Sequence, residues 1–569
     1  MSAPANLLPE NWLKAVREAV DPFGMLDACR QVQQAYLRQP QAWLAELERF
    51  GSGLTAVQLH ALRRYTGERE ADLVSVNEFD ERFQDEVWQE NPFFDHLKEL
   101  YLLGTRWLDD AVRNSPVADP QVRQKAEFLN RQLVNALAPS NLFWSNPAAL
   151  LRALQTGGKS LAQGYANLVS DLNRGTIRMT DESAFRVGEN LATTPGKVVL
   201  RNRLLELIQY APTTPRVHAL PIVLVSPWIN KYYILDLNER KSLIRFLVGQ
   251  GFTVFVTSWK NPVKEHAGTT FDDYLVDGVL QAVEAARSIC NVPQVHLTGY
   301  CIGGTLVAAL MAWLTRARKA GPSPVAHWTL LTTLVDFSEP GEIGVFIDEQ
   351  TIAWLEQRMA KTGYLDGGDM ANAFRALRSN SLVWMYYVHN YLLGEELPRF
   401  DVLFWNMDTT RMPEQMHAFY LREFYLNNRM VEPDGLTLAG RPIDLRRIEQ
   451  PLYVVGAEQD HIAPWRATWK IGALVKGPVR YVLATSGHIL GIINPPTDPP
   501  KRRYWAGEHD GTSTPDAWLE ATPKVPGTWW EDWVGWLGTR CGEQVAPPPL
   551  GNDAHPALAD APGTYVLER

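Results

Sequence analysis

The chain has 569 residues, of which 46% are hydrophobic and 21% charged, and this balance is typical of a globular protein with more than one structural unit. Its net charge of -9 at pH 7 argues against a nucleic-acid-binding protein, because such proteins present a basic surface. Its 4 cysteines are too few and too scattered for a disulfide framework or a zinc site, so we expect a protein of the reducing cytoplasm.

Residues 1–195 predict a helical N-terminal domain. Between residues 8 and 191 the apolar residues recur mostly at helical spacing, with breaks at Asn91-Pro92, at 138–140 and at Gly157-Gly158. The first residues lack the basic and apolar regions of a signal peptide. No apolar run in the sequence approaches the length of a membrane span, so we expect no transmembrane segment.

Residues 196–569 predict an α/β domain. Strand-like runs at 198–200, 204–210, 222–225 and 253–257 alternate with helical segments, which predicts a largely parallel sheet. Strands follow at 295–300 and 329–335. Strand signals then fade over residues 336–441, and we interpret this aromatic-rich helical stretch as a cap inserted into the domain. Strand signals resume at 451–456 and 479–483. The sequence from residue 547 onward predicts an extended tail.

A Gly-Tyr-Cys-Ile-Gly-Gly-Thr motif at 299–305 joins one predicted strand to an apolar helix. It reads as a nucleophile elbow in which Cys301 stands where serine is usual. Such an elbow needs small neighbours, and Gly299 and Gly303 supply them. The dipole and free N–H groups of the following helix favour a thiolate at its start.

Partners for this nucleophile follow in the chain order of an α/β hydrolase. Asp460 lies in the loop after the strand at 451–456, and His488 lies in a small-residue turn after the strand at 479–483. Glu458 is an alternative acid and His461 an alternative base. We favour Asp460 because it lies further out in its loop, and His488 because it follows the final predicted strand.

An oxyanion hole requires two convergent N–H donors, one of them directly after the nucleophile. Ile302 provides that donor. The second is expected from the loop after the strand at 222–225, where Pro227 has no N–H and either Trp228 or Ile229 is the candidate.

A cysteine nucleophile narrows the reaction class. A thiolate that attacks a thioester forms another thioester of similar free energy, so the acyl group stays activated for transfer to a hydroxyl. The residues therefore predict an acyltransferase that uses acyl-CoA, with Cys301 as nucleophile, His488 as base and Asp460 as its orienting acid or as an aid to hydroxyl activation.

Taken together, these residues resemble a polyhydroxyalkanoate synthase over most of the chain. The matching stretches, besides the elbow, are at 91–94, 100–103, 180–185, 187–188, 227–237, 257–262, 404–406, 460–465, 486–488, 494–496 and 527–530.

The resemblance implies polymerisation of (R)-3-hydroxyacyl-CoA with release of CoA, at the surface of a cytoplasmic polyester granule. It implies a homodimer formed largely through the cap, and no metal or redox cofactor, with coenzyme A carried in only by the substrate. The N-terminal domain would then support granule association and the dimer, and phasin-type granule proteins are candidate partners. An α/β-hydrolase fold with a helical cap follows from the same resemblance.

Chain length, the long N-terminal region, Tyr300 and Thr305 look like the single-subunit, short-chain type (class I), for which 3-hydroxybutyryl-CoA is the expected substrate. The substrate-pocket candidates are Trp228, Asn230, Tyr300 and His461, and the bulk of Trp228 bears on the acyl length accepted. Two alternative functions are a cysteine-dependent depolymerase or thioesterase of the same fold, and a non-catalytic granule-coating protein.

Overall fold

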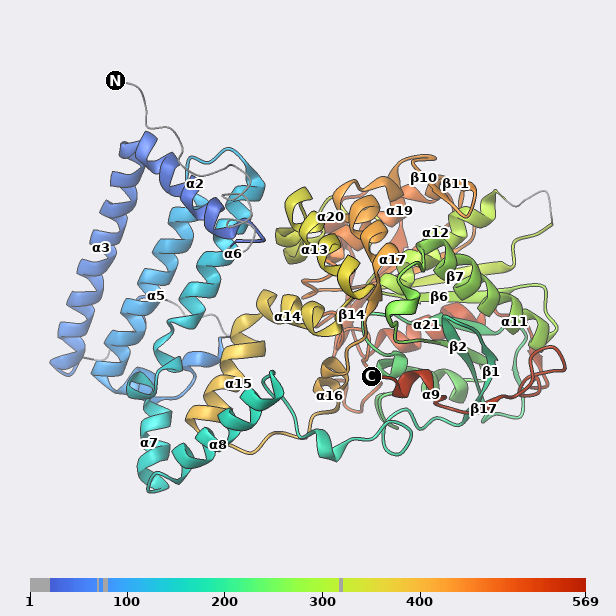
Figure 1. The fold of residues 1–569 in the computed structure, drawn as a ribbon, viewed down its shortest axis with the longest axis horizontal. Coiled ribbons are helices and arrows are strands. Elements are labelled where there is room, and N and C mark those ends of the chain that lie inside the picture. Colours follow the sequence, from blue (N-terminus) through green and yellow to red (C-terminus); the bar gives the residue numbers. More distant parts are fainter. Residues whose placement is uncertain (1–20, 69–70, 75–79, 317–320) are drawn as a thin grey trace. The chain divides into compact units, whose positions relative to one another are not determined.

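A computed structural model describes residues 21–68, 71–74, 80–316 and 321–569 (Figure 1). The chain divides into two compact units. One comprises Met1–Asp181 and Asn372–Arg399, and the other Glu182–Ala371 and Phe400–Arg569. Among the described helices, none combines the length and apolar character needed to cross a bilayer.

The first unit is helical, and several of its helices begin at an Asn-Pro or Asp-Pro pair. The Asn91 side chain accepts a hydrogen bond from the N–H of Phe93 at 3.0 Å, and Asp119 accepts one from Gln121 at 2.8 Å. Each proline that follows has its φ already suited to the first helical position. The unit contains α2 (Met25–Arg38), α3 (Pro40–Tyr65), α4 (Val87–Glu90), α5 (Pro92–Arg113), α6 (Pro120–Ala136), α7 (Pro147–Gln155), α8 (Lys159–Arg174), η10 (Asn380–Trp384), α15 (Met385–Tyr387) and η11 (Val388–Leu392).

Part of the predicted cap belongs to this helical unit, so the units do not coincide with the predicted segments. The Tyr391 hydroxyl donates to Asp171 at 2.8 Å, and the Asn167 amide donates to the Asn390 carbonyl at 3.0 Å. Gly164 allows this close approach, because a Cβ there would lie 2.0 Å from the Tyr391 carbonyl oxygen. Such pairings join residues more than 200 positions apart and leave no local sequence signal.

The second unit is built on an 11-stranded sheet, ordered β15-β14-β13-β12-β7-β6-β4-β5-β2-β1-β17. The six strands from β13 to β5 in that order are mutually parallel, and the outer ones are antiparallel. This confirms the predicted α/β-hydrolase class. The strands are β1 (Gly196–Arg201), β2 (Leu205–Tyr210), β4 (Ile222–Val225), β5 (Val254–Trp259), β6 (Val295–Tyr300), β7 (Val325–Leu331), β12 (Leu452–Ala457), β13 (Val479–Ala484), β14 (Arg503–His509), β15 (Lys524–Pro526) and β17 (Ala559–Asp560).

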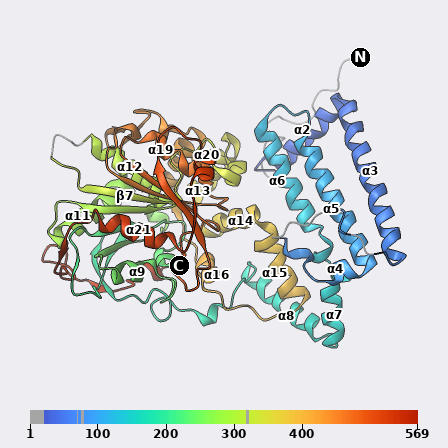
Figure 2. The ribbon, with the colours of Figure 1, turned by 180° about the vertical axis from the view of Figure 1, so that it is seen from behind.

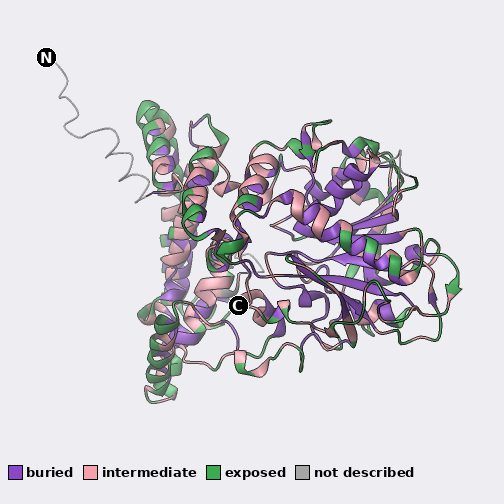
Figure 3. Ribbon diagram, turned by 45° about the vertical axis from the view of Figure 1, so that its right-hand side comes forward, coloured by how far each residue is buried: buried purple, intermediate pink, exposed green. Residues whose placement is uncertain are grey.

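Helices cover both faces of this sheet (Figures 1 and 2). Along β4, Val223 and Val225 join the core that includes α11 (Gln281–Cys290) and α12 (Ile302–Thr315). Ile222 and Leu224 join the core that includes α9 (Leu243–Gly249) and α21 (Trp529–Gly538). This alternation is the period of two expected of a strand that is buried on both faces, and the strands are accordingly buried in Figure 3.

The remaining helices connect the strands or build the part of the cap that stays with this unit. They are α9 (Leu243–Gly249), α10 (Phe271–Asp273), η7 (Tyr274–Leu280), α11 (Gln281–Cys290), α12 (Ile302–Thr315), α13 (Glu349–Thr362), α16 (Asp401–Met407), α17 (Glu414–Phe419), η12 (Tyr420–Leu426), α18 (Trp465–Trp469), α19 (Ile471–Leu474), α20 (Pro515–Ala521) and α21 (Trp529–Gly538); α14 (Gly367–Leu377) spans the division between units. Three short pairs complete the structure: β3 (Val217–His218) with β16 (Gln544–Val545), β8 (Tyr364–Leu365) with β9 (Met412–Pro413), and β10 (Leu436–Leu438) with β11 (Arg441–Ile443).

Some boundaries differ from the sequence prediction. β7 begins at Val325 and ends at Leu331, four residues before the predicted end, because the chain leaves the sheet at Thr332, whose φ is 40°. The predicted final strand is followed by β14 and β15, which add to the sheet edge in antiparallel fashion. The predicted extended tail pairs with the sheet edge, where β17 is antiparallel to β1.

Candidate active site

Cys301 lies at the sharp turn between β6 and α12, with φ 53° and ψ -125°. Only a crowded, fixed surrounding holds a non-glycine residue in this region. A Cβ on Gly299 would lie 2.4 Å from the Gly304 Cα, and one on Gly303 would lie 2.6 Å from the Val225 carbonyl oxygen. The glycines therefore let strand and helix approach closely enough to form the elbow.

Asp460 and His488 meet at the carboxyl ends of neighbouring parallel strands. Asp460 follows β12 and His488 follows β13, and the His488 Nδ1 lies 2.7 Å from the Asp460 Oδ2. The other carboxylate oxygen accepts the backbone N–H groups of Ile462 at 2.8 Å and Ala463 at 2.9 Å. This arrangement occupies Nδ1 and leaves Nε2 as the imidazole nitrogen for proton transfer.

The alternative acid and base do not take these places. Glu458 is exposed, whereas Asp460 is buried and holds the hydrogen bond to His488. His461 lies in the turn after Asp460, and its carbonyl oxygen packs so close to Gly341 that a Cβ there would be 2.8 Å away.

The electrostatics of His488 favour its protonated form. Burial acts to lower its pKa, but the negative charge of Asp460 and of a Cys301 thiolate outweigh it, together with side-chain hydrogen bonds to both. The pKa of His488 is consequently raised well above the usual 6.5. The raised pKa thus favours a positively charged imidazole in this site.

Tyr300, expected as a substrate-pocket residue, lies against His488. Its hydroxyl donates to the His488 backbone carbonyl at 3.3 Å, and the two rings stack with centroids 5.8 Å apart and planes 25° apart. Burial, followed by the charges of Cys301 and Asp460, raises the pKa of Tyr300 well above 10, so its hydroxyl stays a donor.

The loop after β4 is held by Thr410. The Thr410 N–H donates to the Ile229 carbonyl at 3.2 Å, and its hydroxyl donates to the Trp228 carbonyl. The Trp228 carbonyl and the Ile229 N–H belong to the same peptide unit. Because the N–H and C=O of a trans peptide point in opposite directions, the Ile229 N–H points away from Thr410. Ile302 is the first residue of α12, where helix geometry leaves its N–H without an intrahelical acceptor. The second oxyanion donor stays a prediction.

Two further pocket candidates, Trp228 and Asn230, lie in the same loop after β4. The Trp228 indole is buried in the core, with its ring centroid 5.5 Å from that of Trp259 and 4.8 Å from that of Tyr274. The Asn230 amide donates to the Asn406 carbonyl at 3.4 Å. The Trp228 ring thus packs among other aromatic rings, and Asn230 ties the loop to α16.

Two cap tyrosines belong to the surroundings of Cys301, although the sequence does not single them out. Tyr420 and Tyr425 are carried by η12, a π-helical turn, and their ring centroids lie 5.3 Å apart. Burial raises the pKa of both hydroxyls, and the charge of Cys301 contributes to each shift. Their only sequence signal is the aromatic richness of the cap.

One group of potential metal ligands lies in the helical unit. His60, Asp95 and Glu99 bring ligand atoms within 4.8 Å of one another among the described residues. The Lys98 ammonium lies 3.2 Å from Asp95 Oδ1, and the Arg64 Nε donates to Asp95 Oδ2 at 3.2 Å. These side chains already place positive charge on the acids, which argues for a structural ion-pair network.

Comparison with known proteins agrees with this fold. Residues 79–247 match the family model described as "Poly-beta-hydroxybutyrate polymerase (PhaC) N-terminus", and residues 221–495 match the one described as "alpha/beta hydrolase fold".

Curated relatives match along nearly the whole chain. A poly(3-hydroxyalkanoate) polymerase of Methylorubrum extorquens is 41% identical, over 94% of this chain and 88% of its own. A poly(3-hydroxyalkanoate) polymerase subunit PhaC of Rhizobium etli is 37% identical over 100% and 90%, and that of Cupriavidus necator is 42% identical over 86% and 83%. The chain therefore belongs to the poly(3-hydroxyalkanoate) polymerase family, which are acyltransferase-type enzymes with an α/β-hydrolase fold.

Proposed function

We propose that the protein polymerises (R)-3-hydroxyacyl-CoA, with 3-hydroxybutyryl-CoA as the favoured substrate, into polyhydroxyalkanoate with release of CoA. The observation that carries this proposal is a cysteine in a strained elbow beside a buried, hydrogen-bonded His488–Asp460 pair, in a chain of this family. Cys301 is the nucleophile, His488 the proton carrier and Asp460 its orienting acid.

In the acylation step the Cys301 thiolate attacks the thioester carbonyl carbon of the substrate. The oxyanion that forms accepts hydrogen bonds from Ile302 N–H and from a donor of the 228–229 loop. The new C–S bond stays, the C–S bond to CoA breaks, and the departing CoA thiolate takes the proton from His488 Nε2. The raised pKa of His488 supports this step, because it supplies the imidazolium that the leaving group needs.

In the transfer step the now neutral His488 accepts the proton of a 3-hydroxyl group. The hydroxyl oxygen attacks the Cys301 thioester, an ester bond forms, and the C–S bond breaks. The products are a chain longer by one unit, the Cys301 thiolate and a protonated His488, which is the starting state. All proton transfers use side chains of this chain, and the thioester intermediate keeps the acyl group activated between steps.

An incubation with (R)-3-hydroxybutyryl-CoA separates this proposal from its alternatives. We expect CoA thiol release together with an insoluble polymer that yields 3-hydroxybutyrate on alkaline hydrolysis. CoA release with only soluble free acid would identify a thioesterase. Soluble polyester fragments released from added polymer would identify a depolymerase. Absence of all these reactions would identify a coat protein.

We further propose that the enzyme acts as a homodimer at the granule surface, with phasin-type proteins as neighbours there. Support comes from the helical unit, which exposes large apolar side chains such as Trp144, Leu154 and Leu172. Exposed apolar groups in this number mark a surface that contacts another apolar surface. Fractionation of the enzyme with isolated granules, and its molar mass in solution, test these two statements.

A further inference from the structure

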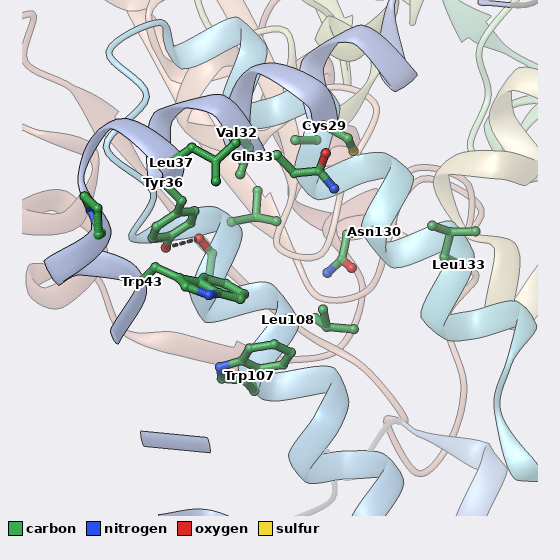
Figure 4. A pocket seen from close by; sticks show the side chains of 14 residues that line it. Cys29, Val32, Gln33, Tyr36, Leu37, Trp43, Trp107, Leu108, Asn130 and Leu133 are labelled. Atoms are coloured by element: carbon green, nitrogen blue, oxygen red, sulfur yellow. Dashed lines mark hydrogen bonds between the residues drawn. The ribbon is translucent and has the colours of Figure 1, made fainter. Parts of the chain in front are cut away.

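The helical unit contains an apolar pocket of about 630 Å³ between α2, α3, α5 and α6 (Figure 4). This volume lies within the roughly 300–1,000 Å³ that small-molecule sites occupy. The rings of Tyr36, Trp43 and Trp107 lie together along one part of its wall, with centroids 5.3 Å apart for the first pair and 5.9 Å for the second. Cys29 lies away from these rings, on α2.

The pocket is open to an apolar rim. Leu37, Leu108 and Leu133 line it and are exposed, as is Trp43. A soluble helical unit normally turns such side chains inward, so a cavity with an apolar wall and an apolar rim indicates an apolar ligand.

No charged side chain is among the lining residues that the structure describes. Burial raises the pKa of the Cys29 thiol and of the Tyr36 phenol, so both are neutral at pH 7. The Tyr36 hydroxyl donates to the Ala111 carbonyl at 2.6 Å, and the Trp107 indole N–H donates to the Glu46 carbonyl at 2.9 Å. The polar atoms of these aromatic side chains are therefore already satisfied within the fold.

Two amide side chains, Gln33 and Asn130, are the strongly polar groups left on the wall. The Asn130 amide nitrogen donates one hydrogen bond to Asp109 at 2.8 Å. An amide N–H can donate to an ester carbonyl, whereas it cannot balance the charge of a carboxylate or a phosphate. The wall thus suits a ligand that is apolar, uncharged and able to accept hydrogen bonds.

We propose that this pocket binds a short stretch of neutral aliphatic polyester, separately from the catalytic centre. The inference rests on the proposed function, which makes such a chain the product. A fatty acid or an acyl-CoA fits less well, because its anionic group would find no cation among the described lining residues. A bound stretch of chain would keep the enzyme on its polymer between additions.

The test uses binding alone, in the full chain, without turnover. The probe is a short (R)-3-hydroxybutyrate oligomer that is acetylated at its hydroxyl end and methylated at its carboxyl end. Cys29 reports occupancy, and its alkylation by N-ethylmaleimide is followed by peptide mass spectrometry. At a concentration about ten times its Kd, the oligomer should slow this alkylation about tenfold, because only the free fraction reacts.

Leu133→Glu places a carboxylate at the rim, where the side chain is 54% exposed to solvent. It should remove the protection of Cys29, and Leu133→Met should retain it. Leu62→Glu on α3 is the matched control, since Leu62 is 62% exposed and does not line the pocket, and it should behave as the wild type.

Several results would overturn the proposal. One is an alkylation rate of Cys29 that the oligomer leaves unchanged, and another is equal protection in Leu133→Glu. Stronger protection by palmitate than by the oligomer would also overturn it. So would protection that rises with enzyme concentration in the absence of oligomer, because it would indicate a second copy of the chain in the pocket. Since no step depends on catalysis, an enzyme that binds the oligomer but releases free acid would contradict the proposed function and leave the pocket standing.

Discussion

The Tyr300 hydroxyl donates a hydrogen bond to the backbone carbonyl of His488 at 3.3 Å, and the rings of the two residues stack. Tyr300 directly precedes Cys301 in the chain. It therefore links the elbow to the loop that carries His488, and a shift of one is transmitted to the other.

Replacing Tyr300 with Phe keeps the stacked ring and removes that hydrogen bond. A hydrogen bond of this kind contributes about 1 kcal/mol, so we expect kcat to fall about fivefold with little change in KM. Steady-state rates of CoA release measure both kcat and KM. Tyr565→Phe is the control, because Tyr565 also donates to a backbone carbonyl, that of Asn202 at 2.8 Å, and should keep its kcat. An equal loss in both variants would show that Tyr300 has no positioning role.

Asp460→Asn removes a charge that raises the pKa of His488. In the wild type the imidazolium persists above pH 6.5, so the alkaline limb of the acylation rate lies above that pH. In the variant this limb should move to lower pH, and elongation should slow more than acylation. Single-turnover CoA release against pH measures the shift. An alkaline limb that stays in place would contradict the role of Asp460.

The same ionisation affects stability. Folding raises the pKa of His488, so the imidazolium stabilises the protein fully below about pH 6.5, the usual pKa of an unfolded histidine, and this stabilisation is lost as the pH rises through the raised pKa. The difference in free energy of unfolding between wild type and Asp460→Asn should therefore shrink as the pH rises through the raised pKa of His488.

Gly299→Ala should destroy the elbow. Its Cβ would lie 2.4 Å from the Gly304 Cα, which is backbone and cannot move aside. We expect a loss of about 1–3 kcal/mol or more in the free energy of unfolding, together with loss of activity. Gly535→Ala on α21 is the control, because nothing lies within 4 Å of its added Cβ, and alanine there should stabilise the helix by about 0.5–1 kcal/mol. Denaturant titration compares the free energies of unfolding of the two variants with that of the wild type.

Thr410→Val keeps the side-chain shape and removes the hydroxyl that donates to the Trp228 carbonyl. The loop that is expected to carry the second oxyanion donor then loses one of its two links to Thr410. Acylation should slow severalfold while the affinity for substrate is kept. Thr539→Val, which removes a hydrogen bond to the Trp536 carbonyl at 3.0 Å, should have no such effect. An unchanged acylation rate in Thr410→Val would separate this loop from catalysis.

The proposed catalytic residues could be placed in one site from the sequence because each follows a strand. Parallel strands bring their carboxyl ends to one edge, so Cys301, Asp460 and His488 could be placed together from chain order alone. The choice between Asp460 and Glu458 depends on which side chain is buried against the histidine, and a loop sequence does not determine this.

Other features depend on packing between distant segments. The π-helical turn that places Tyr420 and Tyr425 near the nucleophile has no period of its own in the sequence. The association of Asn372–Arg399 with α8 likewise depends on single contacts such as Tyr391 with Asp171. A helical pattern predicts that such segments are helices, and it does not predict which surface they cover.

In the proposed mechanism the growing acyl chain is held as a thioester on Cys301. Rapid mixing with (R)-3-hydroxybutyryl-CoA, followed by acid quench and mass spectrometry of the peptide with residue 301, measures this directly. We predict a burst of CoA stoichiometric with active sites, acyl additions on Cys301, and neither signal in Cys301→Ala, with Cys301→Ser reduced to near background because a hydroxyl is a far weaker acid than a thiol. Polymer formation by Cys301→Ala, or an acyl group found on another residue, would show that Cys301 does not carry the chain.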